Sequence, residues 1–257
     1  MTTRCASNQT RGFTWVELLV VIGMMALLAA LLLPALAAAH KKDGRIGCVA
    51  NLKEIGTAFR TGEEAEVGKL PMQVVLTNSE TMKLVANGTA YLLWQTMSNE
   101  LGRPKEFYTP YQATVTFNSD GTLGTPKDSA PGTPGTPKVL YCPDDKRRKA
   151  ATTFSQGFSD ANISYFFSLD VAESYPQMIL DGDDNLMVNG MQVKPGILNL
   201  WTNSTVAWTK ERHHFNGNIG LADGSVMQVT IAGLNRAIAD ITNGVPTNNT
   251  PNRWVIP

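Results

Sequence analysis

The longest apolar stretch of the chain lies close to its N-terminus. From Phe13 to Ala39 the residues are almost all hydrophobic, and only Glu17 carries a charge. At about 1.5 Å per residue, a helix of this length can cross the ~30 Å hydrocarbon core of a bilayer. Arg4 and Arg11 precede it without any acidic residue, which favours a cytoplasmic location for that end. We therefore expect one transmembrane helix over residues 13–39, with the rest of the chain outside the cytoplasm.

A helical pattern continues beyond the span, over residues 40–61. Its apolar positions are Ile46, Val49, Leu52, Ile55 and Phe59. This spacing predicts that the same helix continues and packs one side against a globular head. Gly44, Gly47 and Gly56 each weaken a helix by roughly 1 kcal/mol relative to alanine, so any break is expected near Gly44.

Residues 62–257 are expected to form this head. Residues 88–97 predict a second helix, 114–117 a strand, and 118–138, rich in Gly, Pro, Thr and Ser, a flexible loop. Turn signals such as Asp181-Gly182 and Asp223-Gly224 separate further strand-like runs. These runs are 138–141, 162–169, 185–193, 204–208, 217–222 and 225–231. A long helix followed by an antiparallel sheet predicts an α+β fold with the sheet packed on the helix.

The charge balance gives no support to a nucleic-acid-binding function. The chain has 22 basic and 22 acidic residues, so no net field would attract a polyanion. The basic run Lys146–Lys149 follows Asp144-Asp145 and is interpreted as a solvated loop with local ion pairs, contact with DNA or an acidic partner being the alternative. No nucleophile elbow, phosphate loop or helical pair of zinc-binding histidines is found, so we do not expect an enzyme.

Glu17 is the unusual residue of the apolar run. A charge inside a membrane span costs about 2.5–3.5 kcal/mol and therefore needs a partner. If the chain were cut between Gly12 and Phe13, the new α-amine of Phe13 would lie at the membrane edge. It could then pair with Glu17 of a neighbouring subunit, which would favour assembly.

The segment Arg11–Val20, RGFTWVELLV, closely resembles the cleavage and methylation motif of type IV pilin-like proteins, with Trp15 in place of the commoner leucine. The resemblance implies that a prepilin peptidase removes residues 1–12 after Gly12 and methylates the amine of Phe13. It implies a pseudopilin, a structural subunit of a type II secretion system or type IV pilus that takes part in protein secretion or fibre assembly. Its partners would be other pilin-like subunits and an inner-membrane assembly platform.

The implied location is the bacterial inner membrane, with a single span and an outer head, and then a periplasmic or extracellular fibre. An ordinary secretory signal cut after Ala37 or Ala39 is an alternative, although it leaves Glu17 unexplained, and a plain anchor is another. The alternative function is a membrane-anchored or secreted binding module for a polysaccharide or secreted substrate, with Trp201 and Trp208 as candidate contacts. The shared motif does not distinguish secretion, pilus and uptake machines, or major from minor subunits.

A second resemblance lies near the C-terminus. His213 is followed after nine residues by Asp223-Gly224, similar to the H-x9-DG element of large bacterial prepilin-like proteins. The Asp-Gly pair predicts a tight hairpin, with His213 at the start of its first strand. Zinc bound by His213, His214 and Asp223 is the alternative, but adjacent histidines on a strand point to opposite faces.

Cys48 and Cys142 lie in the part expected outside the cytoplasm, whereas Cys5 belongs to the leader. A disulfide would join the helix to the start of the sheet, and two free thiols are the equal alternative because the sequence gives no distance. Residues 141–145 and 51–56 also resemble elements of the same family.

An oxygen-rich cluster remains. Asp181, Asp183 and Asn185 match the first three ligand positions of a calcium-binding loop. The expected glycine and closing acid are missing, so the segment is not an EF-hand. Calcium is retained as a candidate because major pseudopilins of type II secretion carry a calcium loop in their heads. A solvated acidic turn is the alternative.

Overall fold

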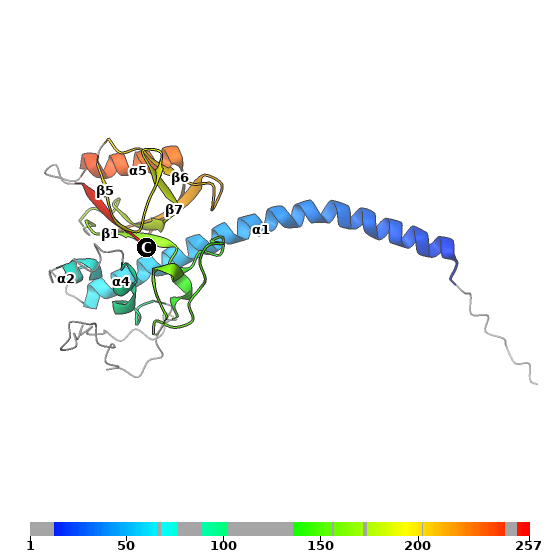
Figure 1. The fold of residues 1–257 in the computed structure, drawn as a ribbon, viewed down its shortest axis with the longest axis horizontal. Helices are drawn as coiled ribbons and strands as arrows, with labels where there is room; N and C mark the ends of the chain where they lie inside the picture. Colours follow the sequence, from blue (N-terminus) through cyan, green and yellow to red (C-terminus); the bar gives the residue numbers. More distant parts are fainter. Residues whose placement is uncertain are drawn as a thin grey trace, which may run out of the picture. The chain divides into compact units, whose positions relative to one another are not determined.

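The computed structural model describes residues 13–65, 68–76, 89–101, 136–155, 157–171, 174–201, 203–244 and 251–257. The chain divides into two compact units, 1–43 and 44–257. The leader with Gly12, the strand expected at 114–117 and most of the loop expected at 118–138 lie outside the described residues. The order of elements, a long N-terminal helix followed by antiparallel strands, gives the α+β class and a pilin-like architecture (Figure 1).

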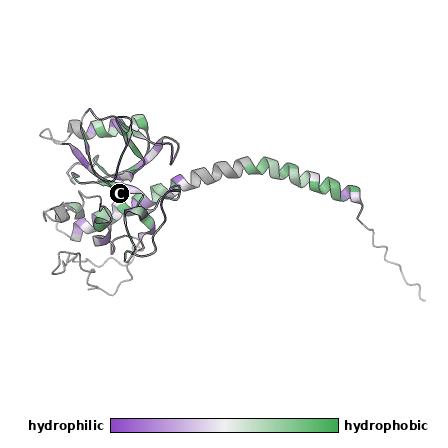
Figure 2. Cartoon of the chain, in the orientation of Figure 1, coloured by the Kyte–Doolittle hydropathy of each residue, from purple (hydrophilic) through white to green (hydrophobic). Residues whose placement is uncertain are grey.

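Helix α1 runs from Trp15 to Ala65 as one helix of 51 residues. In the first unit, its segment Trp15–Leu33 is long and apolar enough to cross a membrane. The side chains of this segment are all exposed, and Figure 2 shows it as a hydrophobic stretch. In water such a surface would be unfavourable, so the segment requires an apolar environment or apolar neighbours.

In the second unit, α1 contributes one side of the core of the head. Its fully buried side chains are Cys48, Leu52, Ile55, Ala58 and Phe59. The expected apolar stripe is therefore largely confirmed, but Ile46 is exposed. Phe59 lies 5.4 Å, between ring centroids, from Trp94, which lies 5.4 Å from Phe167, so aromatic contacts connect α1 to a second helix and to the sheet.

The break expected near Gly44 is absent, since α1 continues through this residue. Gly44 and Gly47 instead leave space for groups of a neighbouring segment. A Cβ atom at Gly44 would overlap the carboxylate of Asp144, and one at Gly47 would lie 3.1 Å from the ring of Pro143. The two glycines lower the helix propensity of this segment, but they allow the segment with Pro143 and Asp144 to approach the helix closely.

The main sheet has six strands, all paired antiparallel, in the order β5-β9-β1-β2-β7-β8. Its strands are β1 (Tyr165–Ser168), β2 (Ile179–Asp183), β5 (Gly196–Leu200), β7 (Asn216–Leu221), β8 (Val226–Thr230) and β9 (Asn252–Ile256). A smaller antiparallel sheet has the order β4-β3-β6. Its strands are β3 (Leu186–Val188), β4 (Met191–Gln192) and β6 (Val206–Trp208). The expected runs 162–169, 185–193, 204–208, 217–222 and 225–231 each overlap one or two strands of these sheets.

The short helices complete the head. They are α2 (Pro71–Leu76), α4 (Tyr91–Thr96), α5 (Ile231–Gly244) and the 3-10 helices η2 (Pro137–Leu140) and η3 (Asp160–Asn162). The helix expected at 88–97 is confirmed by α4. Helix α5 packs against β6 and β8 (Figure 1), and Asn235 of α5 donates a 2.6 Å hydrogen bond to the backbone oxygen of Val206.

Three expectations were wrong or incomplete. The strand expected at 138–141 is the 3-10 helix η2, which Pro137 begins with its fixed φ. Asp181-Gly182 is not a turn but part of β2, where the glycine is needed because a Cβ atom would lie 2.8 Å from the ring of Phe166. Strands β2, β5 and β9 and helix α5 were not predicted.

Candidate functional site

The start of α1 contains a reciprocal cap. The backbone N–H and the hydroxyl of Thr14 donate to Oε2 of Glu17, at 2.9 and 2.8 Å, while the backbone N–H of Glu17 donates to Oγ1 of Thr14 at 3.3 Å. This is the capping box, which satisfies amide groups that have no partner within the helix. Phe13 and Trp15 beside it are 71% and 83% exposed. Glu17 therefore has a local structural role, as a helix cap, that was not predicted from the sequence.

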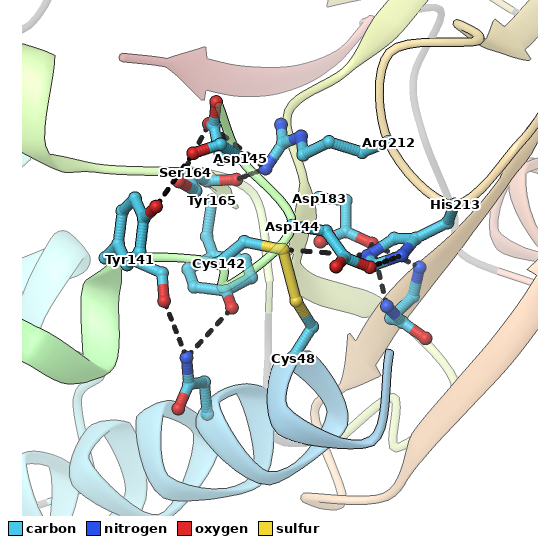
Figure 3. Close-up of a disulfide and its surroundings, with 12 residues drawn as sticks. Cys48, Tyr141, Cys142, Asp144, Asp145, Ser164, Tyr165, Asp183, Arg212 and His213 are labelled. Carbon is cyan, nitrogen blue, oxygen red and sulfur yellow. Dashed lines mark hydrogen bonds and ion pairs between the residues drawn. A yellow bond between two sulfur atoms is a disulfide. The ribbon is translucent and has the colours of Figure 1, made fainter. Parts of the chain in front are cut away.

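In the head, three segments meet beside α1 (Figure 3): the segment around Cys142, strand β1 and the turn that contains His213. The structure joins Cys48 and Cys142 in a disulfide, one of the two states that the sequence left open. One turn further along α1, the amide of Asn51 donates to the backbone oxygen of Tyr141 at 2.8 Å and to the hydroxyl of Tyr165 at 3.1 Å. The disulfide and one hydrogen bond thus hold the segment around residue 142 against the helix, and the second hydrogen bond attaches β1 to it.

The third segment, the turn before β7, brings His213 beside the disulfide. His213 lies in a turn before β7 and not at the start of the strand as expected. His213, His214 and Phe215 have φ values of 50°, 50° and 61°, in the left-handed region that costs such residues about 1–2 kcal/mol each. This conformation separates the histidines, since His213 is buried and His214 is exposed.

Hydrogen bonds hold this unusual turn. Arg45 donates to the backbone oxygen of His213 at 2.9 Å, and the amide of Asn216 donates to the oxygens of His213 and His214 at 3.3 and 3.0 Å. Backbone strain of this kind persists where the surroundings determine it and is concentrated at functional sites.

Each ring nitrogen of His213 has a carboxylate neighbour, and Nε2 also has a sulfur neighbour (Figure 3). Nδ1 lies 3.0 Å from Oδ2 of Asp144, at an angle outside that of a well-formed hydrogen bond. Nε2 lies 3.6 Å from Sγ of Cys142 and 3.6 Å from Oδ2 of Asp183. Burial lowers the pKa of His213, although Asp183 and Asp144 act in the opposite direction. The ring is therefore neutral at pH 7.

The acidic cluster is not a solvated turn. Asp181 and Asp183 lie in β2, on the same face because they are two residues apart, and both are fully buried. Burial raises the pKa of Asp181 well above its ordinary value. Asp183 accepts hydrogen bonds at Oδ2 from the backbone and the side-chain amide of Asn218, at 2.7 and 2.9 Å. Asn185 is also buried and lies between β2 and β3, so two of the three proposed calcium ligands belong to a strand and the three do not form a calcium-binding loop.

A buried ion-pair network adjoins this cluster. Arg212 is buried and contacts Asp184 and, at 3.5 Å, Asp145. Arg148 lies 2.5 Å from Asp184 and 3.3 Å from Asp145. Burial alone would raise the pKa of Asp145, but Arg212, the backbone N–H of Arg147 and other neighbours lower it. The local ion pairs expected for the basic run are present at Arg147 and Arg148, but the expected solvated position was wrong for Arg148, whose side chain is largely buried.

The Asp223-Gly224 pair forms the turn between β7 and β8. Gly224 has a φ of 79°, and the backbone N–H of Ser225 donates to Oδ1 of Asp223 at 2.8 Å. Arg60 of α1 donates to the backbone oxygen of Asp223 at 2.9 Å. Among the described contacts none joins His213 to Asp223, since the two lie at opposite ends of β7.

The two tryptophans proposed for ligand binding differ. Trp208 is fully buried and belongs to the core, whereas Trp201 is 46% exposed. Arg45, Arg212, Asp144 and Asn218 were not predicted as site residues from the sequence. The signal for Asp144 was its place in the Cys-Pro-Asp-Asp run, while the others depend on contacts distant in sequence.

Comparison of the chain with protein-family models, with curated proteins and with solved structures gave no significant match.

Proposed function

We propose that this protein is a pseudopilin: a pilin-like structural subunit that prepilin peptidase processes after Gly12 and that assembles through its N-terminal helix into a type II secretion or type IV pilus-like fibre. The observation that carries the proposal is the exposed apolar helix Trp15–Leu33 with a carboxylate in its first turn, followed by an α+β head. The apolar helix and the disulfide also indicate a location outside the cytoplasm for the head.

The carboxylate of Glu17 can serve both the cap and assembly. Both hydrogen bonds from Thr14 fall on Oε2. An ionised carboxylate accepts about four hydrogen bonds over its two oxygens, so the α-amine of Phe13 from a neighbouring subunit could pair with the same group. In an apolar surrounding this pair would be strongly favoured over two separate charges.

In this proposal the protein begins as a single-pass protein of the bacterial inner membrane with its head outside. Prepilin peptidase, other pilin-like subunits and the inner-membrane assembly platform are its partners. The head is a structural body and not an enzyme, and no nucleic acid is required.

The substitution Glu17→Gln tests the proposal. Glutamine at this position of a capping box can still accept from Thr14, so the helix start is kept while the charge is removed. We expect Glu17→Gln to reach the membrane and to be processed as the wild type is, but to be absent from sheared fibres and from subunit cross-links. Glu64→Gln, an exposed carboxylate further along α1, is the matched control and should assemble normally. Normal assembly of Glu17→Gln would contradict the proposal.

A further inference from the structure

We propose that the head contains a zinc site that forms when Cys48 and Cys142 are reduced, with Sγ of both cysteines, Nε2 of His213 and a carboxylate oxygen of Asp183 as ligands. One ligand atom from each of these four residues lies within 4.8 Å of all the others, and all four residues are buried. The site differs from a pairing of His213, His214 and Asp223, because His214 is exposed and Asp223 lies at the other end of β7. It does not depend on the proposed function.

The distances suit a tetrahedral ion. Zinc bonds of about 2.3 Å to sulfur and about 2.0–2.1 Å to nitrogen or oxygen place neighbouring ligand atoms roughly 3.3–3.8 Å apart. Nε2 of His213 lies 3.6 Å from Sγ of Cys142 and 3.6 Å from Oδ2 of Asp183, so two edges of the tetrahedron already have this length. The sulfur of Cys48 is bonded to that of Cys142 and completes the group (Figure 3).

The surroundings orient the ligands as they do in zinc proteins. Oδ2 of Asp144 lies 3.0 Å from Nδ1 of His213, so a carboxylate stands beside Nδ1, while Nε2 is the ring nitrogen on the side of the Cys142 sulfur. The carboxylate of Asp183 is fixed by two hydrogen bonds from Asn218.

Packing of a disulfide alone does not account for these neighbours. A disulfide needs neither a carboxylate nor an imidazole beside it. Asp183 is fully buried, and its Oδ1 has no hydrogen-bond partner among the described residues. Burying a polar oxygen in this way costs free energy unless something binds it. The left-handed turn at His213 adds a further cost that a metal ligand would justify.

The disulfide and the zinc site are two states of the same four residues. A dithiol reductant transfers two electrons and two protons to the Cys48–Cys142 bond and becomes a disulfide itself. The two thiols then lose their protons as their sulfurs bind Zn²⁺. In the oxidised state the sulfurs are bonded to each other and cannot act as thiolate ligands. Zinc would therefore hold together in the reduced head the same segments that the disulfide joins in the oxidised head.

The test uses the full chain in detergent with Cys5→Ser, so that Cys48 and Cys142 are its only cysteines. The protein is reduced under anaerobic conditions with a phosphine that does not bind metal, and is then titrated with Zn²⁺ against a chromophoric chelator and with Co²⁺. We expect one zinc ion per reduced chain and none per oxidised chain. Cobalt should give the bands of a tetrahedral site and a sulfur-to-cobalt charge-transfer band.

Variants separate the site from adventitious binding. His213→Ala and Asp183→Asn should each lose the stoichiometric site, and Asp144→Ala should weaken zinc binding by about 10–100-fold, as loss of an orienting carboxylate does. His214→Ala, one residue away and exposed, should bind like the parent. Circular dichroism follows folding in every sample.

The zinc titration of the parent chain tests the proposed site even if a variant unfolds. A reduced parent that is folded but binds no zinc would overturn the proposal, as would a cobalt spectrum without the sulfur band. A reduced parent that unfolds and is not refolded by zinc would also overturn it. Equal losses in His213→Ala and His214→Ala would show that the bound metal is elsewhere.

Discussion

Arg45 of α1 donates a 2.9 Å hydrogen bond to the backbone oxygen of His213, and Arg60 of the same helix donates one of the same length to the oxygen of Asp223. The two residues that define the H-x9-DG element are therefore both attached to the N-terminal helix. Strand β7 runs between them. The nine residues between His213 and Asp223 thus allow both ends of β7 to contact one helix.

Replacing Arg45 tests this attachment. We expect Arg45→Ala to lower the free energy of unfolding by about 1.5–3 kcal/mol, because a hydrogen bond from a charged donor is lost and the left-handed turn loses support. Lys53→Ala, an exposed position of the same helix, should change it by less than about 0.5 kcal/mol. Urea unfolding at constant detergent measures both, and equal effects would contradict the role of Arg45.

Two glycines of α1 should respond to alanine with opposite signs. Gly44→Ala should lower the free energy of unfolding by about 1–3 kcal/mol, because its Cβ displaces Asp144 from His213. Gly56→Ala should raise it by up to about 1 kcal/mol, because the nearest atom is 3.8 Å away and alanine favours a helix. The same urea titrations decide the signs, and stabilisation by Gly44→Ala would show that this close approach is absent.

The buried carboxyl of Asp160 should make stability depend on pH. Burial raises the pKa of Asp160 to about 6, although the backbone N–H of Tyr91 donates to it at 2.6 Å. The folded state therefore holds more protons than the unfolded state between about pH 4 and pH 6, and stability falls as pH rises through this window.

The variant Asp160→Asn isolates this effect, because its amide can accept the same hydrogen bond without ionising. Thermal unfolding should show the variant more stable than the wild type at pH 7, with a difference that shrinks towards about pH 4. Asp240→Asn removes the same charge from an exposed position of α5 and serves as the control. A difference between Asp160→Asn and the wild type that does not change with pH would contradict the assignment.

Local patterns predicted the parts of the fold that depend on local interactions. The apolar run gave the N-terminal part of α1, and Asp223-Gly224 gave the hairpin, because both signals lie within a few residues. Asp181-Gly182 has the same sequence pattern but lies inside β2. Its glycine is needed for close packing against the ring of Phe166 and not for a turn. Ile231, Leu234 and Ile238 have helical spacing, so α5 could have been found from the sequence.

The site was harder to predict because its residues come from distant segments. Cys142 and His213 were each noted in the sequence, but in separate motifs. Asp183 was interpreted as part of a calcium loop, and only the pairing of β2 with β7 brings it beside Asn218 and His213. A sequence motif gives the residue types, whereas the strand register decides which of them meet.

The N-terminal residue of the mature protein tests the central claim most directly. The protein would be extracted from membranes of cells with and without prepilin peptidase, and its N-terminal peptide would be sequenced by mass spectrometry. The pseudopilin account predicts a chain that begins at a methylated Phe13 only when the peptidase is present. A chain that begins after Ala37 or Ala39, or an intact Met1 in cells with an active peptidase, would contradict it.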